Sequence, residues 1–529
     1  MVVVEFEYSD FKELLGMPKD KVVEILSEIG APAEVDPETG KIFAEITPNR
    51  PDWYSITGLA RALHAYNKKE VKKYAAAKGD YRIVVDKTVA KIRPYTTAVV
   101  IKGLKLNDLK IRDIVVLQEK LIFTLGRIVK RFGIGIYPLD KIQFPLKYTT
   151  MKSSAIAYVP LNYTGKKTSA AEILEKHPKG IAYGYLIKGN KELPVYLDAN
   201  NNILALIPIV NSEETGKVDE STKDVFIEVT GMDETSITQA LNILTCHFLD
   251  LGGMAYTVTV EYEKEKKTGP ALEYKKVNIT EKEVEKILGV ALKKEKINEM
   301  LGRMGYLVEK GQVYAPPYRT DIINNVDVIE DVAIVYGYNN FEPTTPNFFH
   351  PGKKNTRGRR LGDTMARLGF NEITTPILIS KEKLAEFGQE GIDVLNPKTV
   401  EYTTIRSTAL PALVEILVKN KMRGLPQSFY EVGTVVAGKE KTVLVFALVD
   451  KSLDFSKARG VLQTLFRECG REFKLENAQL AYFEQPYAAN LLHAGKQCGV
   501  FGKLAKKIAD VYGLEYSIFL CQIDVAALL

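Results

Sequence analysis

The chain has 529 residues, 46% of them hydrophobic and 26% charged, and a net charge of +6. At about 150 residues per domain this length predicts three or four domains, and the lack of any apolar run near the roughly 18 residues that a bilayer requires excludes a membrane span. The small positive charge permits a nucleic-acid partner without requiring one, because a solvated lysine-rich surface gives the same value.

The cysteines and the amino terminus indicate the compartment. The four cysteines are far apart in the sequence with no Cys-x-x-Cys pair, which favours reduced, mostly buried thiols over a zinc knuckle. The first residues lack the basic start and long apolar core of a secretion signal. We therefore expect a cytoplasmic protein.

Residues 1–78 predict a small helix–strand–helix module. Apolar residues at helical spacing mark a helix over residues 18–29 that a glycine ends. A short strand follows at residues 42–46, then a proline-rich turn at residues 48–52 and a second helix over residues 55–66. These elements form the first predicted domain.

Residues 79–262 predict a separate domain of mixed strands and helices. A helix with a basic end is expected over residues 116–131. A strand over residues 225–230 leads through a turn into a helix that Asp233 is placed to cap. The charge-rich segment 261–276, which surrounds a Gly-Pro pair, is typical of a linker.

Alternation along the strand at 225–230 divides its side chains between two faces. Glu228 and Thr230 share one face with Phe226, so that a carboxylate and a hydroxyl lie beside an aromatic ring. Such a face suits a polar binding pocket. An ordinary solvated strand face gives the same pattern, so both interpretations stay open.

Residues 316–340 predict a turn that leads into a helix with an acidic face. The spacing of Asp327, Glu330 and Asp331 places them on one side of the helix, and Asp321 comes from the turn just before it. Four carboxylates are therefore expected to converge, and hard oxygen ligands at such a corner suit Mg2+. The alternative is that acidic residues in a first helical turn interact with the helix dipole alone.

The order of features in this second region repeats that of the first module. Each has a helix, a glycine, an Arg-x-Asp turn at residues 50–52 or 319–321, and a further helix. Two related modules therefore flank the inserted domain. The first has Arg61 and Ala62 where the second has its acidic pair, so only the second, residues 270–344, is expected to bind metal.

Residues 345–529 predict a last domain, separated by a proline-containing hinge at residues 342–346. It begins with a helix over residues 356–368. Glycine and an aromatic residue follow that helix, and then a strand that a proline closes.

The motifs that carry a family resemblance are Arg319-Thr-Asp321, Asp327-Val-Ile-Glu330-Asp331 and Tyr336-Gly-Tyr-Asn339. They resemble the B5 domain of the phenylalanyl-tRNA synthetase beta subunit family in its archaeal and eukaryotic form, and the resemblance covers almost the whole chain. In that family the residues matching Asp321, Asp327, Glu330 and Asp331 are assigned to Mg2+. The resemblance therefore implies Mg2+ as a cofactor.

The inserted domain resembles the B3/B4 editing domain of that family, through Asn211-Ser-Glu and Phe226-Ile-Glu228-Val-Thr230-Gly. The resemblance implies hydrolysis of mischarged tyrosyl-tRNA(Phe), with Glu228, Thr230 and Asn211 as editing residues. A second site is also chemically expected, since a pocket shaped for phenylalanine rejects an added hydroxyl by only ~100-fold. A carboxylate at Glu228 that accepts the phenol proton would supply the discrimination.

The last domain is similar to class II aminoacyl-tRNA synthetases. Residues 356–376 resemble the first motif of that class, and Phe429-Tyr-Glu431-Val-Gly433 resembles the strand of the second motif. The motif-two arginine for ATP and the glycine-rich third motif are missing, so the resemblance implies an inactive domain of catalytic type. Arg406 is expected to form a structural salt bridge rather than to bind ATP.

The sequence thus predicts an α+β multidomain chain: a B1-like module (1–78), a mixed α/β editing-like domain (79–262), a B5-like module (270–344) and a class II-like antiparallel sheet domain without catalytic motifs (345–529). The implied function is that of the beta subunit of a phenylalanine-tRNA ligase. Its implied partners are tRNA(Phe) and an alpha subunit that binds ATP and phenylalanine, in an (αβ)2 heterotetramer. Two alternatives stay open, a non-catalytic tRNA-binding or assembly protein of the same fold and a free-standing hydrolase of mischarged tRNA.

Overall fold

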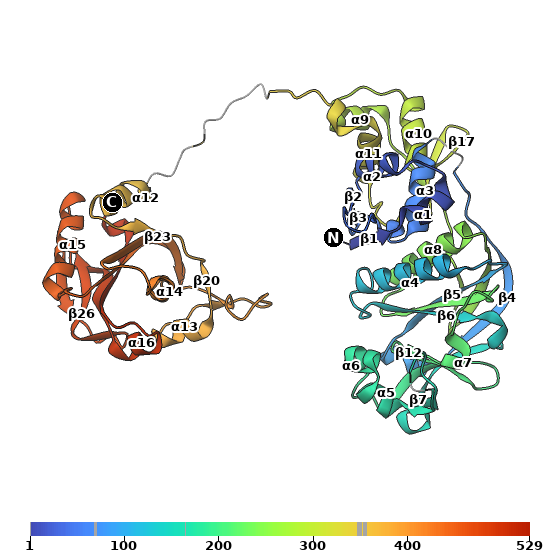
Figure 1. Ribbon diagram of the computed structural model, residues 1–529, viewed down its shortest axis with the longest axis horizontal. Helices are drawn as coiled ribbons and strands as arrows, with labels where there is room; N and C mark the ends of the chain where they lie inside the picture. The colour runs from blue at the N-terminus through green and yellow to red at the C-terminus, as the bar shows by residue number, and fades with distance from the viewer. Residues whose placement is uncertain (1, 68–70, 164, 346–351, 353–356) are drawn as a thin grey trace. The chain divides into compact units, whose positions relative to one another are not determined.

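The chain divides into two compact units, Met1–Thr344 and Thr345–Leu529, whose elements Figure 1 labels. The computed structural model describes residues 2–67, 71–163, 165–345, 352 and 357–529. Within these ranges no helix is both long and apolar enough to cross a membrane. The end of the predicted hinge, Pro346, lies outside the described residues.

The first unit opens with a three-stranded antiparallel sheet in the order β1-β3-β2, together with three helices. The elements are β1 (Val2–Phe6), α1 (Tyr8–Leu15), α2 (Lys19–Glu28), β2 (Ala33–Val35), β3 (Ile42–Ile46) and α3 (Ile56–Tyr66). Val22 and Leu26 of α2 share a buried core with Leu59 of α3, and the Ser55 hydroxyl caps α3 by accepting from the Gly58 N–H. The helices and strand that the sequence predicts here are confirmed.

A ten-stranded sheet forms the middle of this unit, in the order β12-β11-β10-β7-β4-β14-β5-β13-β6 with β15 paired to β14. The strands are β4 (Ala76–Val85), β5 (Tyr95–Lys102), β6 (Phe132–Pro138), β7 (Leu146–Lys152), β10 (Glu192–Leu197), β11 (Ile203–Leu206), β12 (Val210–Asn211), β13 (Val225–Gly231), β14 (Met254–Glu261) and β15 (Lys266–Gly269). Helices α4 (Asp108–Phe123) and α8 (Glu234–Asp250) cover one face, as Figure 1 shows. This order makes β6 an edge strand and β13 its inner neighbour.

Two predicted elements of this domain differ from the structure. The helix expected over residues 116–131 ends at Phe123, because the chain then turns through three successive left-handed residues, Arg127, Ile128 and Val129. Part of the segment expected as a linker, residues 261–276, is instead strand β15. β15 pairs with Val258–Glu261 of β14, beyond the residues of β14 that pair with β5, and this gives the charged segment a backbone ladder that composition does not indicate.

The second small module has the same strand arrangement as the first. Its sheet has the order β16-β18-β17, so that in both modules the third strand in sequence lies between the first and the second. Its elements are β16 (Lys275–Val277), α9 (Glu281–Leu288), α10 (Lys294–Arg303), β17 (Leu307–Glu309), β18 (Gln312–Ala315) and α11 (Asn325–Tyr336). Left-handed glycines, Gly16 and Gly289, cap the first helix of each module.

The second unit is a seven-stranded, mostly antiparallel sheet in the order β19-β23-β24-β28-β27-β26-β25. Its strands are β19 (Asn371–Glu372), β23 (Gln427–Ala437), β24 (Lys439–Asp450), β25 (Lys474–Asn477), β26 (Phe483–His493), β27 (Lys496–Leu504) and β28 (Ser517–Asp524). Residues of α12 (Arg357–Arg367) and α15 (Phe455–Glu468) share one buried core, and residues of α14 (Leu410–Asn420) and α16 (Lys506–Val511) share another. The predicted helix at 356–368 is confirmed as α12, although its first residue lies outside the described ranges.

Candidate functional site

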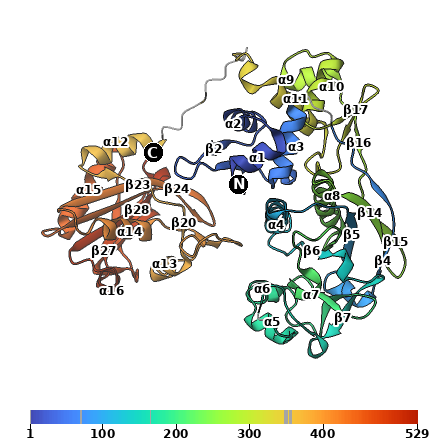
Figure 2. The same ribbon diagram turned by 45° about the vertical axis from the view of Figure 1, so that its right-hand side comes forward.

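A cavity of ≈ 810 Å³ opens at the edge of the large sheet. Its lining comes from α4 on one side of β6, and from the β12 region and α6 (Pro178–Tyr183) on the other. In Figures 1 and 2 alike, α4 lies above β6 and α6 below it. Asn211, Glu228 and Thr230 all line this cavity, so the structure brings the three predicted editing residues together.

Glu228 reaches the cavity from the inside of the sheet. It lies in β13, which pairs with β5 on one side and with β6 on the other, and every residue of β13 is buried. Val225, Ile227 and Val229 of β13 pack into the core on the face that the helices cover. Phe226 belongs to the apolar cluster on the opposite face. Because Glu228 itself is only 1% exposed, the interpretation of an ordinary solvated strand face is wrong.

Burial changes the acidity of this carboxyl group. The pKa of Glu228 rises to about 8, because removal from water disfavours the charged form, while the nearby Arg93 and a hydrogen bond from Tyr137 act in the opposite direction. A large share of the group therefore keeps its proton at neutral pH. The carboxyl becomes ionised as the pH rises through about 8.

Two polar atoms of the cavity have no hydrogen-bond partner among the described residues. These atoms are Oε2 of Glu228 and the hydroxyl oxygen of Thr230, and both are buried. A buried polar atom without a partner costs about 1–3 kcal/mol relative to a satisfied one. Such atoms are therefore well suited to bind a polar group of a ligand.

Glycines clear the space in front of these side chains. A Cβ at Gly135 would collide with the Glu228 carboxyl and the Tyr137 phenol, and one at Gly216 would lie 2.7 Å from the Asn211 Cβ. At Gly133 the added Cβ would lie 3.1 Å from a Pro208 carbon. Gly133 lines the cavity, and Gly135, two residues further along the same face of β6, leaves room for the Glu228 carboxyl and the Tyr137 phenol.

Sequence reasoning missed two buried residues that support the site. Tyr137 contacts both Glu228 and Asn211 through its hydroxyl. Arg93 donates from Nε and Nη2 to the Thr230 carbonyl at 3.2 and 3.0 Å, and from Nη2 to the Val129 carbonyl at 3.1 Å. The alternation Gly-x-Gly-x-Tyr along residues 133–137 was the available signal for the first. We find no local sequence signal for Arg93.

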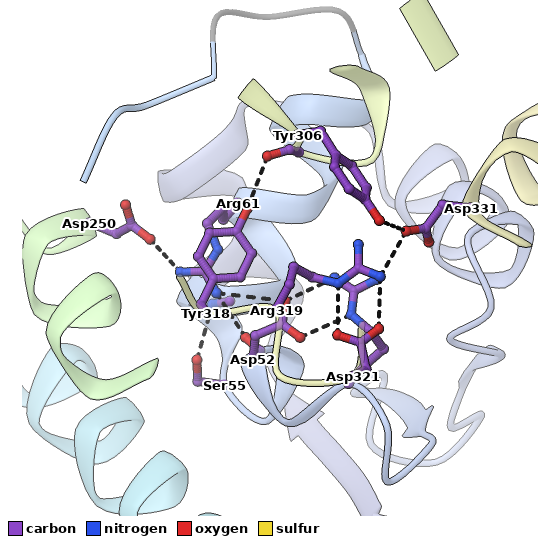
Figure 3. A network of polar contacts seen from close by, with 12 residues as sticks. Asp52, Ser55, Arg61, Asp250, Tyr306, Tyr318, Arg319, Asp321 and Asp331 are labelled. Carbon is purple, nitrogen blue, oxygen red and sulfur yellow. Dashed lines mark hydrogen bonds and ion pairs between the residues drawn. The ribbon is translucent and has the colours of Figure 1, made fainter. Parts of the chain in front are cut away.

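The second predicted site, the acidic corner, is built around an arginine. Arg319 donates from Nε to Oδ1 of Asp321 at 2.9 Å, and its Nη2 lies 2.7 Å from Oδ2 of Asp321. The same Nη2 lies 2.7 Å from Oδ2 of Asp331, which also accepts from the Tyr306 hydroxyl at 2.6 Å. Figure 3 shows this arrangement. Burial opposes ionisation of Asp321, but the guanidinium holds the pKa of that carboxyl below its usual value.

The other two acidic residues point elsewhere. Asp327 turns back and accepts from the backbone N–H groups of Ile323 and Asn324 at 2.7 and 2.8 Å, completing a capping box at the start of α11. Glu330 is exposed. Asp327 therefore satisfies the helix terminus, as the alternative interpretation expected.

The prediction that four carboxylates converge on Mg2+ is thus wrong for this structure. In the described part of the chain, no three or more acidic, histidine or cysteine side chains gather as metal ligands. Arg319 already supplies the positive charge for Asp321 and Asp331, so these residues do not fit the ion. Sequence spacing predicted one shared face, but Asp331 is buried and Glu330 is exposed, and spacing did not show that a guanidinium lies between Asp321 and Asp331.

The first module contains the same pairing of an arginine with the aspartate two residues later. Arg50 donates from Nε and Nη2 to the two carboxylate oxygens of Asp52, both at 2.9 Å. Nearby, Arg61 pairs with Asp250 of α8 at 2.7 Å and stacks over the ring of Tyr318 at 4.1 Å, as Figure 3 shows from close by. Arg61 thus links both modules to the sheet domain.

In the second unit, Arg406 forms the structural salt bridge that the sequence predicted. Its Nη2 lies 2.8 Å from Oε1 of Glu431, Nε donates to the Thr434 carbonyl at 3.0 Å, and Nη1 donates to the Thr375 hydroxyl. The side chain is 2% exposed. A guanidinium so fully engaged has little capacity left for a nucleotide.

Two protein-family models match the chain, the tRNA synthetase B5 domain over residues 277–338 and the phenylalanyl tRNA synthetase beta chain CLM domain over residues 342–525. These matches define an aminoacyl-tRNA synthetase chain. The phenylalanine–tRNA ligase beta subunit of Archaeoglobus fulgidus is 34% identical over 100% of this chain and 98% of its own length. That of Methanosarcina barkeri is 33% identical over 99% and 98%.

A solved structure agrees with these sequence relatives. An N-terminal fragment of the phenylalanyl-tRNA synthetase beta subunit from Pyrococcus horikoshii matches with a TM-score of 0.60 and 32% identity, and the match covers 63% of this chain and 99% of the fragment. The chain belongs to the family of phenylalanine–tRNA ligase beta subunits, as its motifs predicted.

The contacts of Arg319 with Asp321 and Asp331 predict that removal of the guanidinium destabilises the second module. Arg319→Met leaves two buried carboxylates without their counter-charge, which typically costs about 3–5 kcal/mol. We expect faster amide hydrogen exchange along α11, measured by mass spectrometry on the full chain at pH 7. Lys296→Met is the matched control, because it removes an exposed ion pair with Glu299 from the same module and should change exchange little.

The same measurement tests whether Mg2+ binds to these carboxylates. We expect α11 exchange to be the same with Mg2+ and with a chelator. Protection that increases with Mg2+, and that Asp327→Ala and Glu330→Ala together abolish, would show that the carboxylates do hold the ion.

Proposed function

We propose that this beta subunit hydrolyses tyrosyl-tRNA(Phe) in the cavity around Glu228. It would do so in the cytoplasm, within an (αβ)2 heterotetramer whose alpha subunit binds ATP and phenylalanine and attaches phenylalanine to tRNA(Phe). The observation that carries the proposal is the pair of buried, unpartnered oxygens, on Glu228 and Thr230, that line a cavity. The full-length similarity to beta subunits supports the role in the ligase.

Tyrosine is distinguished by its phenol. The hydroxyl donates to the free Oε2 of Glu228 and so satisfies a buried acceptor, whereas phenylalanine leaves that oxygen without a partner. The aromatic ring is accommodated by the cavity of ≈ 810 Å³ that Glu228 and Thr230 line. A site that hydrogen-bonds a hydroxyl rejects the analogue lacking it far more strongly than an apolar pocket rejects an added hydroxyl.

The reaction is the hydrolysis of an ester. A water oxygen bonds to the carbonyl carbon, the bond from that carbon to the ribose oxygen breaks, and the ribose oxygen leaves with a proton, so that tyrosine and uncharged tRNA are released. Thr230 and Asn211 are the polar groups beside Glu228 in the cavity, and we assign them to orienting the ester or the attacking water.

Removal of the carboxyl group should slow this hydrolysis. A hydrogen bond to a charged group contributes about 1.5–3 kcal/mol, so Glu228→Ala should slow deacylation of preformed tyrosyl-tRNA(Phe) by about 10- to 150-fold in the purified complex at a pH above 8, where the carboxyl is ionised. Phenylalanylation should be unchanged, and Glu228→Asp should be milder because it keeps an acceptor. Deacylation at the unaltered rate in Glu228→Ala would contradict the assignment.

The raised pKa of Glu228 predicts the pH dependence. An ionised carboxylate accepts a phenol proton more strongly than a neutral acid. Since the ionised fraction grows as the pH rises through about 8, kcat/KM for tyrosyl-tRNA(Phe), corrected for uncatalysed hydrolysis, should rise from pH 6.5 to above 8. Glu228→Gln should lack this rise, and a profile that it shares with the unaltered complex would assign the titration to another group.

The beta chain should not activate phenylalanine by itself. The candidate arginine of its class II-like unit, Arg406, is buried against Glu431, and the sequence lacks the other nucleotide-binding motifs. We expect no phenylalanine-dependent exchange of pyrophosphate into ATP by the purified beta chain. Exchange activity that persists after complete removal of the alpha chain would contradict this expectation.

A further inference from the structure

We propose that Tyr137 is a positioning residue of the editing cavity, whose phenol holds Glu228 and Asn211 so that a single oxygen of Glu228 stays free for the substrate. This inference rests on the proposed editing function. It adds a side chain that the sequence motifs do not assign to the site.

Tyr137 lies on the edge strand β6 and is completely buried. Residues two apart on a strand share a face, so Tyr137 faces the same side as Gly133 and Gly135. Its ring lies 5.9 Å from that of Phe226, centroid to centroid. The ring position is therefore fixed by packing, independently of the hydroxyl.

The hydroxyl joins the two polar walls of the cavity. It lies 3.3 Å from Oδ1 of Asn211 and 3.4 Å from Oε1 of Glu228, so one proton is shared between two acceptors at the long end of the hydrogen-bond range. Burial, and then the nearby Glu228, raise the pKa of Tyr137 well above its usual value. The phenol thus stays protonated and remains a donor at every pH at which the protein works.

This contact makes the two oxygens of the Glu228 carboxyl unequal. Oε1 faces the Tyr137 phenol, while Oε2 has no partner among the described residues. The terminal torsion of a glutamate is broad and two-fold, so without the phenol the carboxyl can rotate and turn its free oxygen away. Tyr137 selects the orientation that presents Oε2 to the phenol of a substrate.

Gly135 makes the contact possible. A Cβ at this position would meet both the Glu228 carboxyl and the Tyr137 phenol. The absence of a side chain at Gly135 therefore allows the Glu228 carboxyl and the Tyr137 phenol to approach each other over the backbone of β6.

The test is Tyr137→Phe in the assembled complex, which keeps the ring and removes one oxygen. We expect kcat for tyrosyl-tRNA(Phe) deacylation to fall by about 5- to 20-fold with a smaller change in KM. The hydrogen bond from the Tyr137 hydroxyl lowers the pKa of Glu228. Its loss should raise that pKa, so the rising limb of the kcat/KM profile should move to higher pH. Tyr148→Phe is the matched control, because it removes another fully buried phenol of the same core, one that donates to the Arg93 carbonyl.

The outcomes separate this inference from the function on which it rests. If the unaltered complex deacylates tyrosyl-tRNA(Phe) and Glu228→Ala does not, but Tyr137→Phe keeps the normal rate and pH profile, then the positioning role alone is overturned. Equal losses in Tyr137→Phe and Tyr148→Phe, with the pH profile unmoved and lowered melting temperatures, would also overturn it in favour of a purely structural role. No deacylation by the unaltered complex would overturn both proposals.

Discussion

The ion pair between Arg61 and Asp250 holds the first unit together at the point where its three parts meet. Arg61 belongs to the first module, Asp250 ends a helix of the sheet domain, and Tyr318, on which Arg61 stacks, belongs to the second module. Both charged side chains are mostly buried, at 11% and 14% exposure. Because separating them would leave a charge without compensation in a dry interior, the modules and the sheet domain share one stable arrangement.

Helix α4 carries this constraint towards the cavity. At one point along it, Asp113 accepts from the backbone N–H groups of Ile56 and Thr57 at 2.7 and 3.1 Å, and so caps α3 of the first module from outside. Further along, Gln118 lines the cavity and donates to the carbonyl of Ile134 in the edge strand at 2.9 Å. Helix α4 therefore contacts the first module at one point and forms one wall of the cavity at another. The first module thus helps to hold that wall in place.

Local periodicity was sufficient to predict several features of the fold and of the candidate site. Alternation placed Glu228 and Thr230 on one face of a strand, and helical spacing located α2 and α3, because both periods are set within a few residues. Contacts between distant elements were not predictable in this way. Arg319 lies between its two carboxylates, and Tyr137 meets Glu228, only because separate elements pack together. The sequence placed Glu228 on a polar strand face, but its burial results from the pairing of β13 with β5 on one side and β6 on the other.

The two strands that begin and end the sheet domain pair with the same strand, β14. Ala76 of β4 is opposite Ala255, and Gly269 of β15 is opposite Val258. At roughly 3.4 Å per residue and 4.8 Å per strand, the chain enters and leaves the domain at points about 14 Å apart. About five residues of extended chain would span that gap. The chain thus enters and leaves the sheet domain at neighbouring points, so that the two related modules stay close together although the whole domain lies between them in the sequence.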